Sequence, residues 1–215
     1  MISKAKFRAA TVLVAAFLLS GCLDTMTAGG LTAASRRAPQ KLTVAAGAVT
    51  IAAPPGYCIN SSVSQDSSEG AFVLLGSCRA LRGLFSPAPA DPAILTASVS
   101  GVAQEGDAPE RHTDQLERYF RSRSGQKALS RSGDASTVSI LATDSTDEAF
   151  FVQVRDTSDT LNSGLNEDYW RALIDVNGYL ITASVMTFDA SPMTSGSARQ
   201  TLERFTTRLR RENEL

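Results

Sequence analysis

Histidine and cysteine, which build most metal sites and many catalytic ones, are scarce in this chain. It contains one histidine, His112, and three cysteines among 215 residues, whereas a zinc or other imidazole site needs several such ligands. A Ser-His-Asp triad would depend on His112, which falls on the polar side of a predicted helix, and no Gly-x-Ser-x-Gly motif occurs. We therefore expect no metal site and no serine hydrolase of this kind.

The glycine-rich loops that bind phosphate groups are also missing. Neither a Gly-x-x-x-x-Gly-Lys loop nor a Gly-x-Gly-x-x-Gly motif occurs, so we expect no nucleotide cofactor. A basic excess is missing too, because 21 Lys and Arg residues stand against 22 Asp and Glu residues, a net charge of −1. Without a positive field, the chain is not expected to bind nucleic acid.

The N-terminus follows the pattern of a secretory signal peptide. A positively charged start at 4–8 precedes an apolar run at 9–19, and small residues close the segment. The apolar run is short for a membrane span, which takes about 20 residues. An uncleaved membrane anchor or a buried helix is the alternative interpretation, but no stop-transfer pattern follows.

The end of this segment resembles the lipobox of bacterial lipoproteins, in which a leucine and two small residues precede a cysteine. Here these residues are Leu19, Ser20, Gly21 and Cys22. The resemblance implies cleavage before Cys22, a diacylglyceryl thioether on its sulfur and a further acyl chain, such as palmitate, on its new amino group. Several acyl chains make anchoring almost permanent. The resemblance also implies attachment to the periplasmic face of a membrane. In proteobacterial lipoproteins, an Asp directly after the lipidated cysteine favours retention in the inner membrane. Here Leu23 holds that position and the Asp follows at Asp24, so we expect the outer membrane in preference to the inner one.

This reading divides the chain into a signal peptide at 1–21, a lipidated flexible tether at 22–40 and a single domain at 41–215. The tether is rich in Thr, Ala, Gly and Ser and lacks apolar periodicity. The segment 1–21 carries three basic residues and no acidic one. Its removal would leave a net charge of about −4, which again gives no basic field.

With Cys22 used by lipid, Cys58 and Cys78 remain as a pair. In an oxidising compartment such a pair normally forms a disulfide. Closing a loop of about 20 residues would contribute roughly 3 kcal/mol in the chain-entropy model. A redox or metal pair is the alternative, and the lack of Cys-x-x-Cys spacing disfavours it.

Two helices are predicted within the domain. Asp107 and Glu110 form a capping box for the first, and Gly125 is its expected stop. The second is expected at 197–213, with an apolar stripe of Ala198, Leu202, Phe205 and Leu209. Short apolar segments between turn residues predict strands at 42–45, 49–52, 57–64, 71–78, 93–102, 137–142 and 149–155.

The clearest local signal lies at 169–188. Asn177-Gly178 separates two apolar, β-prone runs, which is the strongest short hairpin signature. A two-residue turn fixes the register, and strand alternation then places eight residues on one buried face. The expected pairs are Val176 with Tyr179, Ile174 with Ile181, Ala172 with Ala183, and Trp170 with Val185. The second face carries Tyr169, Leu173, Leu180 and Met186, which form a candidate contact surface; cover by a helix is the alternative, and the commoner one.

Runs of adjacent strands favour an α+β fold, an antiparallel sheet of about six to eight strands with two helices packed against it. The element order and the early Pro55-Gly56-Tyr57 stretch resemble the PsbP/Mog1-like architecture. The resemblance implies a fold and not a function, because members of that group have unrelated roles, mostly as accessory or binding proteins.

Two further features are candidate contact sites. Leu84 and Phe85 lie between Gly83 and Ser86 in a proline-rich loop, where an exposed apolar pair would suit partner recognition; covering the edge of the core is the alternative. An oxygen-rich loop offers calcium ligands, but its spacing differs from an EF-hand and favours a solvated loop. Its residues are Asp156, Asp159, Asn162, Asn166, Glu167 and Asp168.

The anchor, the tether and the lack of a recognisable catalytic set predict a non-catalytic binding or accessory protein of the cell envelope. Its expected partner is another envelope protein or a cell-wall component. A carboxylate-based envelope hydrolase is one alternative, and it requires two close carboxylates in a cleft with raised pKa values. A small-ligand carrier is the other, and it requires a dry cavity of several hundred Å³.

Overall fold

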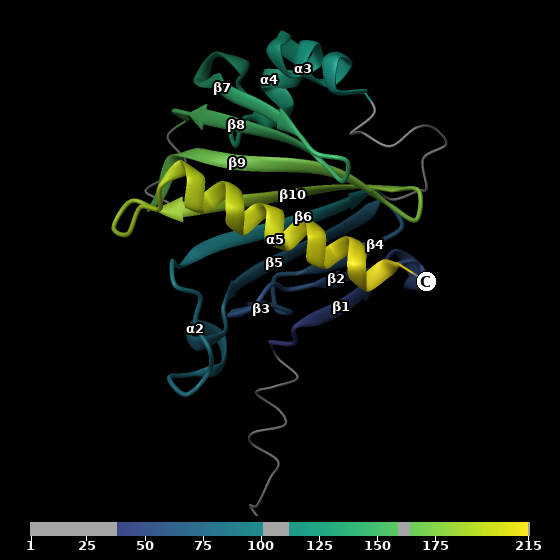
Figure 1. Cartoon of the computed structure of the whole chain (residues 1–215), viewed down its shortest axis with the longest axis vertical. Helices are drawn as coiled ribbons and strands as arrows, with labels where there is room; N and C mark the ends of the chain where they lie inside the picture. The colour runs from purple at the N-terminus through teal and green to yellow at the C-terminus, as the bar shows by residue number, and fades with distance from the viewer. Residues whose placement is uncertain (1–37, 101–111, 159–163, 215) are drawn as a thin grey trace, which may run out of the picture.

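The computed structural model describes residues 38–100, 112–158 and 164–214. An antiparallel sheet of eight strands forms its frame, in the order β3-β5-β6-β10-β9-β8-β7, with β4 pairing β5 beside this path (Figure 1). Helices pack against the sheet, so the predicted α+β class is confirmed. The strands are β3 (Tyr57–Ile59), β4 (Gln65–Ser67), β5 (Gly70–Ser77), β6 (Ala93–Ser100), β7 (Val138–Ser145), β8 (Phe150–Asp156), β9 (Leu165–Val176) and β10 (Tyr179–Phe188).

A second, two-stranded sheet is formed by β1 (Lys41–Val44) and β2 (Val49–Ala52), joined through the short 3-10 turn η1 (Ala45–Gly47). Four α-helices lie in the described ranges, two more than expected. They are α2 (Cys78–Arg82), α3 (Thr113–Arg121), α4 (Arg123–Leu129) and α5 (Ser195–Asn213). A further 3-10 turn, η3 (Ala135–Thr137), leads into β7. None of the described helices is long and apolar enough to cross a membrane.

The predicted central helix is two helices that meet at Ser122. The backbone of Ser122 is extended (ψ 160°), which ends α3, and its side chain accepts a hydrogen bond from the backbone N–H of Gly125 and so caps α4. Gly125 therefore lies inside α4 and is not the stop that the sequence predicted. A Cβ on Gly125 would lie 2.6 Å from the carbonyl carbon of Tyr119, and closer still to its oxygen. Glycine thus permits the tight approach of the two helices, while Asp107 and Glu110 lie outside the described residues.

The hairpin of β9 and β10 has the predicted register, from Tyr179 opposite Val176 to Val185 opposite Trp170. One face of the hairpin joins the main core with β1, β2 and α5. The predicted stripe of α5 is buried in that core: Ala198, Leu202, Phe205 and Leu209.

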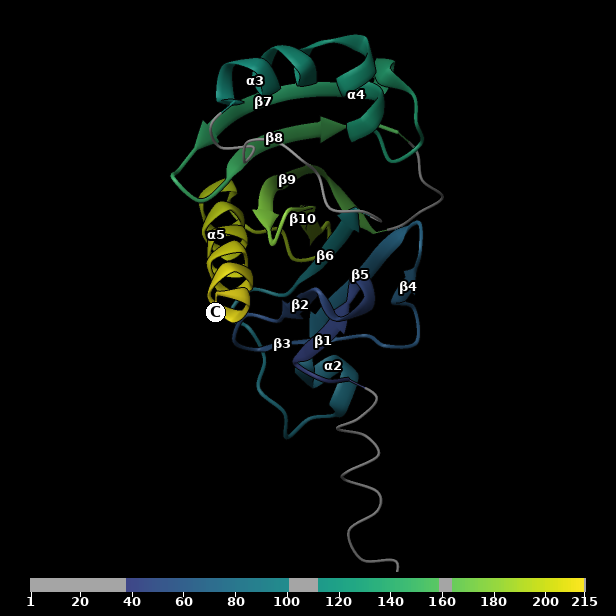
Figure 2. The same ribbon diagram turned by 90° about the vertical axis from the view of Figure 1, so that its right-hand side faces the viewer.

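The other face of the hairpin packs into a second core beneath α3 and α4, which Figure 2 shows over the β7–β8 edge of the sheet. Phe120 of α3 stacks on Phe150 of β8 with 5.9 Å between ring centroids, and Leu129 of α4 is also buried there. Tyr169 and Leu173 are buried in this core, whereas Leu180 and Met186 pack against it and are only partly buried.

Candidate functional site

The disulfide lies where the described chain begins. Cys58 of β3 and Cys78, the first residue of α2, are bonded, with 4.8 Å between their Cα atoms, as the sequence predicted. Ala38 is buried against this pair. Its carbonyl oxygen accepts a hydrogen bond of 2.7 Å from Nε of Arg82, and the Pro39 oxygen accepts one of 2.7 Å from the backbone N–H of Ile59. Packed structure is therefore present three residues before the predicted domain start at 41, whereas Cys22 lies outside the described residues.

Leu84 and Phe85 lie in the loop after α2, with exposed fractions of 81% and 106%. They do not cover the edge of the core, which was the alternative interpretation of this pair. The backbone N–H of Ser86 donates to the carbonyl of Gly83 at 3.0 Å, so the two apolar residues occupy the centre of a tight turn.

A groove of about 640 Å³ runs along the outer face of α5. Its other wall is formed by the start of β1 and by the connection between β2 and β3. The α5 residues Gln200, Arg204, Thr207 and Arg211 line it at intervals of three or four, the spacing of one helical face. This stripe lies beside the buried apolar stripe of the same helix. The rest of the lining is Glu203, Arg208, Gln40, Lys41, Ala53 and Pro55.

The groove carries more positive than negative side chains. Lys41 forms an ion pair with Glu212, and Arg208 lies 3.8 Å from the same carboxylate. A hydrogen bond from Lys41 lowers the pKa of Glu212, so this acid stays ionised. Arg204 and Arg211 are exposed and add two further guanidinium groups.

Tyr57 lies close to this region and is fixed as a neutral phenol. Its hydroxyl donates to the carbonyl of Asp91 at 3.0 Å. Burial raises the pKa of Tyr57 to about 12, although the nearby positive charge of Arg204 lowers it in part. The phenol therefore keeps its proton at neutral pH and supplies no base to the groove.

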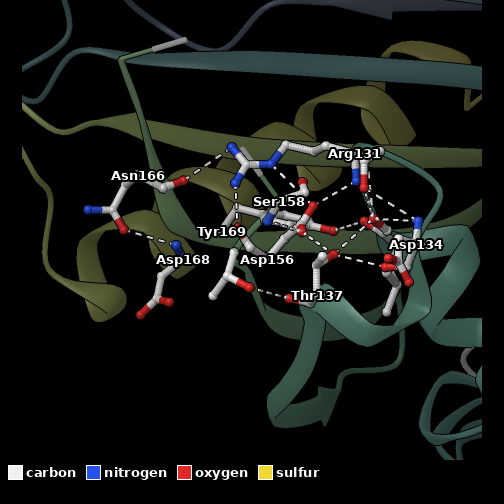
Figure 3. A network of polar contacts seen from close by, with 12 residues as sticks. Arg131, Asp134, Thr137, Asp156, Ser158, Asn166, Asp168 and Tyr169 are labelled. Carbon is white, nitrogen blue, oxygen red and sulfur yellow. Dashed lines mark hydrogen bonds and ion pairs between the residues drawn. The ribbon is translucent and has the colours of Figure 1, made fainter. Parts of the chain in front are cut away.

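A polar network around Asp156 occupies the opposite half of the domain (Figure 3). The side chain of Asp156 has no exposed surface, and Oδ2 accepts from the backbone N–H of Arg131 at 2.7 Å and from its Nε at 3.3 Å. Oδ1 accepts from the Thr137 hydroxyl at 2.8 Å and from the backbone N–H of Ser158 at 3.0 Å. Nη2 of Arg131 donates to the Asp156 carbonyl at 2.7 Å, and Nη1 to the Asn166 carbonyl at 3.4 Å.

Burial by itself would raise the pKa of Asp156, but the hydrogen bonds from the backbone of Arg131 and Ser158 outweigh it, and the pKa is lowered. The carboxylate is therefore a fully bonded structural anion. This network ties η3, the end of β8 and the start of β9 together.

Of the six candidate calcium ligands, Glu167 is exposed, and the others either bond to other groups or lie beyond the described ranges. Asp156 binds Arg131, and Asp168 forms two hydrogen bonds with Arg155, at 2.7 and 2.9 Å. The Asn166 side chain accepts from the backbone N–H of Asp168. Asp159 and Asn162 lie outside the described residues. Within the described ranges, no group of three or more His, Cys, Asp or Glu side chains has the geometry of a metal site.

Sequence reasoning missed both the groove and the network. The arginines at the end of α5 suggest only charges that complement the helix dipole. The spacing of Arg204, Arg208 and Arg211 is the signal that would have placed them on one outer face. No local signal connects Arg131 with Asp156, which are 25 residues apart.

Comparisons of the chain with protein-family models, with curated proteins and with solved structures found no significant match. The likeness to the PsbP/Mog1-like architecture and the lipobox resemblance therefore remain predictions.

Proposed function

We propose that this chain is a lipid-anchored protein of the bacterial cell envelope that acts by binding, and that the α5 groove is its binding site. The observation that carries the proposal is the row of guanidinium groups in the groove, on a chain whose net charge is −1. Guanidinium groups bind carboxylates and phosphates through paired hydrogen bonds. The partner is therefore an envelope component that presents anionic groups.

Three acids of the described chain have lowered pKa values, which suits bonded carboxylates and not the general acid of a hydrolase. A general acid in a glycosidase needs a raised pKa. Hydrogen bonds to the backbone and side chain of Ser136 lower the pKa of Asp134, and the pKa values of Asp156 and Glu212 are also lowered.

The chemistry of the groove also distinguishes it from the site of an apolar carrier. Such carriers enclose their ligand among hydrophobic side chains. The groove is instead open along α5. Eight of its ten lining residues are charged or polar, although more apolar than polar surface faces the space. Charged groups on a partner, rather than a buried apolar ligand, match this surface.

Metabolic labelling tests the anchor. The unaltered chain, expressed in a bacterial host, should incorporate labelled palmitate, and Cys22→Ser should abolish the label and leave the precursor uncut. Unchanged labelling of Cys22→Ser would refute the lipoprotein assignment.

Site-specific photo-crosslinking in intact cells tests the groove. A photoreactive residue at Thr207, which is exposed in the groove, should yield an adduct that the same residue at exposed Ser139 on β7 does not. Adding Arg211→Glu should remove most of the adduct, because it reverses one charge of the groove, whereas Arg118→Glu on α3 should not. Equal adducts at Thr207 and Ser139, or adducts indifferent to Arg211→Glu, would contradict the assignment of the groove.

A further inference from the structure

The turn formed by Gly83, Leu84, Phe85 and Ser86 presents two large apolar side chains at its tip. Turn centres are normally occupied by glycine, proline or small polar residues. Here Leu84 and Phe85 are exposed by 81% and 106%. An exposed apolar pair at the tip of a turn indicates a surface that is buried against a partner or a membrane when the protein functions.

The base of this turn is fixed, so the apolar tip stays away from the core. Before the turn, α2 is held by the disulfide between Cys58 and Cys78. After the turn, Pro89 passes so close to Gly56 that a Cβ there would lie 2.6 Å from the proline nitrogen. The hydrogen bond from Tyr57 to the carbonyl of Asp91 holds the chain two residues later.

The same end of the molecule receives the N-terminal segment. Arg82, one residue before the turn, donates its Nε to the carbonyl of Ala38, the first described residue. In Figure 1 and Figure 2 the loop between α2 and β6 lies at the lower end of the molecule, where the described chain also begins in purple. Residues 22–37 join the predicted lipid site to Ala38 in the sequence, and linkers of this length that behave as random coils typically reach about 20–25 Å. A membrane that holds Cys22 is therefore nearest to this end.

The charge of this end suits an anionic lipid surface. Arg79 is exposed and Arg82 is partly exposed, and the sequence from Gly70 to Ala90 contains no acidic residue. Arginines at the level of the headgroups, with an aromatic residue and a leucine below them, form the usual pattern of an interfacial contact.

We propose that the Leu84–Phe85 turn inserts into the bilayer that holds the lipidated Cys22, so that the α2 end of the domain faces the membrane. The proposal rests on the proposed lipid anchor and adds a second contact with the same membrane. The acyl chains supply the lasting attachment, and the turn sets the orientation of the domain on it. The arginines of α2 would lie against the phosphates of the headgroups.

Fluorescence quenching by brominated lipid tests this orientation. The full chain carrying Phe85→Trp is expressed in a bacterial host and purified in its palmitate-labelled form. It is then reconstituted into vesicles of phosphatidylethanolamine and phosphatidylglycerol, with and without bromine on the acyl chains. Leu141→Trp is the matched control, because Leu141 is 42% exposed and lies on β7, at the opposite end of the sheet order from β3. The signal of native Trp170 is subtracted with the unaltered protein.

The indole introduced by Phe85→Trp should shift its emission to the blue in plain vesicles and lose intensity in brominated ones. The indole introduced by Leu141→Trp should do neither. If the palmitate-labelled protein is in the vesicles and both indoles behave alike, the membrane contact of the turn is overturned while the anchor stands. If no palmitate is incorporated, the anchor fails, and the orientation that depends on it fails too.

Discussion

Removal of the Asp156 carboxylate should destabilise the domain far more than removal of an exposed acid that also pairs with arginine. In Asp156→Ala, the guanidinium of Arg131 loses its anion although its side chain is only 15% exposed. The backbone N–H groups of Arg131 and Ser158 and the hydroxyl of Thr137 lose their acceptor as well. Breaking one partner of a buried ion pair costs about 3–5 kcal/mol, because the other charge stays buried without compensation.

The matched control is Asp168→Ala, which breaks the ion pair with Arg155. These two side chains are 33% and 49% exposed, and water replaces the lost contact, so the expected cost is below about 1 kcal/mol. Urea unfolding, followed by far-UV circular dichroism, gives the free energy of unfolding for both variants. Equal losses in the two variants would refute the view that the Asp156 network holds this half of the domain together.

The pH dependence provides a second test of the same carboxylate. Because the folded pKa of Asp156 is lowered, its contribution is complete above the unfolded value, which is about 3.9. The contribution is lost as the pH falls from there through the lower folded value. The unaltered protein should therefore lose stability over this acid range, and Asp156→Asn should lose less of its remaining stability over the same range. A parallel decline of the two proteins would assign the acid sensitivity to other groups.

Three further perturbations have expected outcomes in the same unfolding assay. Trp170→Ala should lower the free energy of unfolding by about 3–5 kcal/mol, because the ring is buried in the main core. Arg171→Ala, on the other face of the strand, should lower it by about 1 kcal/mol. The reverse order of the two losses would contradict the register. Reduction of the Cys58–Cys78 bond, which spans 20 residues, should lower the free energy of unfolding by about 3 kcal/mol, because the unfolded chain gains conformational freedom. An unchanged urea midpoint of unfolding would contradict this reasoning. Gly125→Ala should lower the free energy of unfolding by about 1–3 kcal/mol, because its methyl group would overlap the end of α3. Gly196→Ala, whose methyl group would lie 4.0 Å from the Thr194 hydroxyl, an ordinary contact, should be neutral or slightly stabilising.

Local chemistry explains which parts of the fold were predictable. The register of β9 and β10 follows from the two turn residues Asn177 and Gly178, because the turn fixes the pairing of the residues beside it. The apolar stripe of α5 is equally local, since its spacing alone identifies the buried face. The disulfide followed from the compartment and the number of cysteines rather than from geometry.

The parts that sequence reasoning missed depend on contacts between distant segments. The break at Ser122 arises because Gly125 approaches the backbone of Tyr119, which no periodicity reveals. The Asp156 network joins residues from four separate places in the chain, and a buried pair looks the same in sequence as two solvated charges. The groove forms only when α5 packs on β2, next to β1, so its cationic lining is a consequence of tertiary structure.

The place where the N-terminal segment joins the domain also determines how a pulling force would be carried. A load applied through residues before 38 reaches the carbonyls of Ala38 and Pro39 first, which are bonded to Arg82 and Ile59. Those residues belong to the two elements that the disulfide joins, so the force is divided between α2 and β3 across a covalent link. The next structure along the chain is the separate sheet of β1 and β2, which can yield without breaking a bond of the eight-stranded sheet. Because Gln40 and Lys41 line the α5 groove, yielding of this small sheet would also open the groove, so tension on the N-terminal segment would weaken binding there.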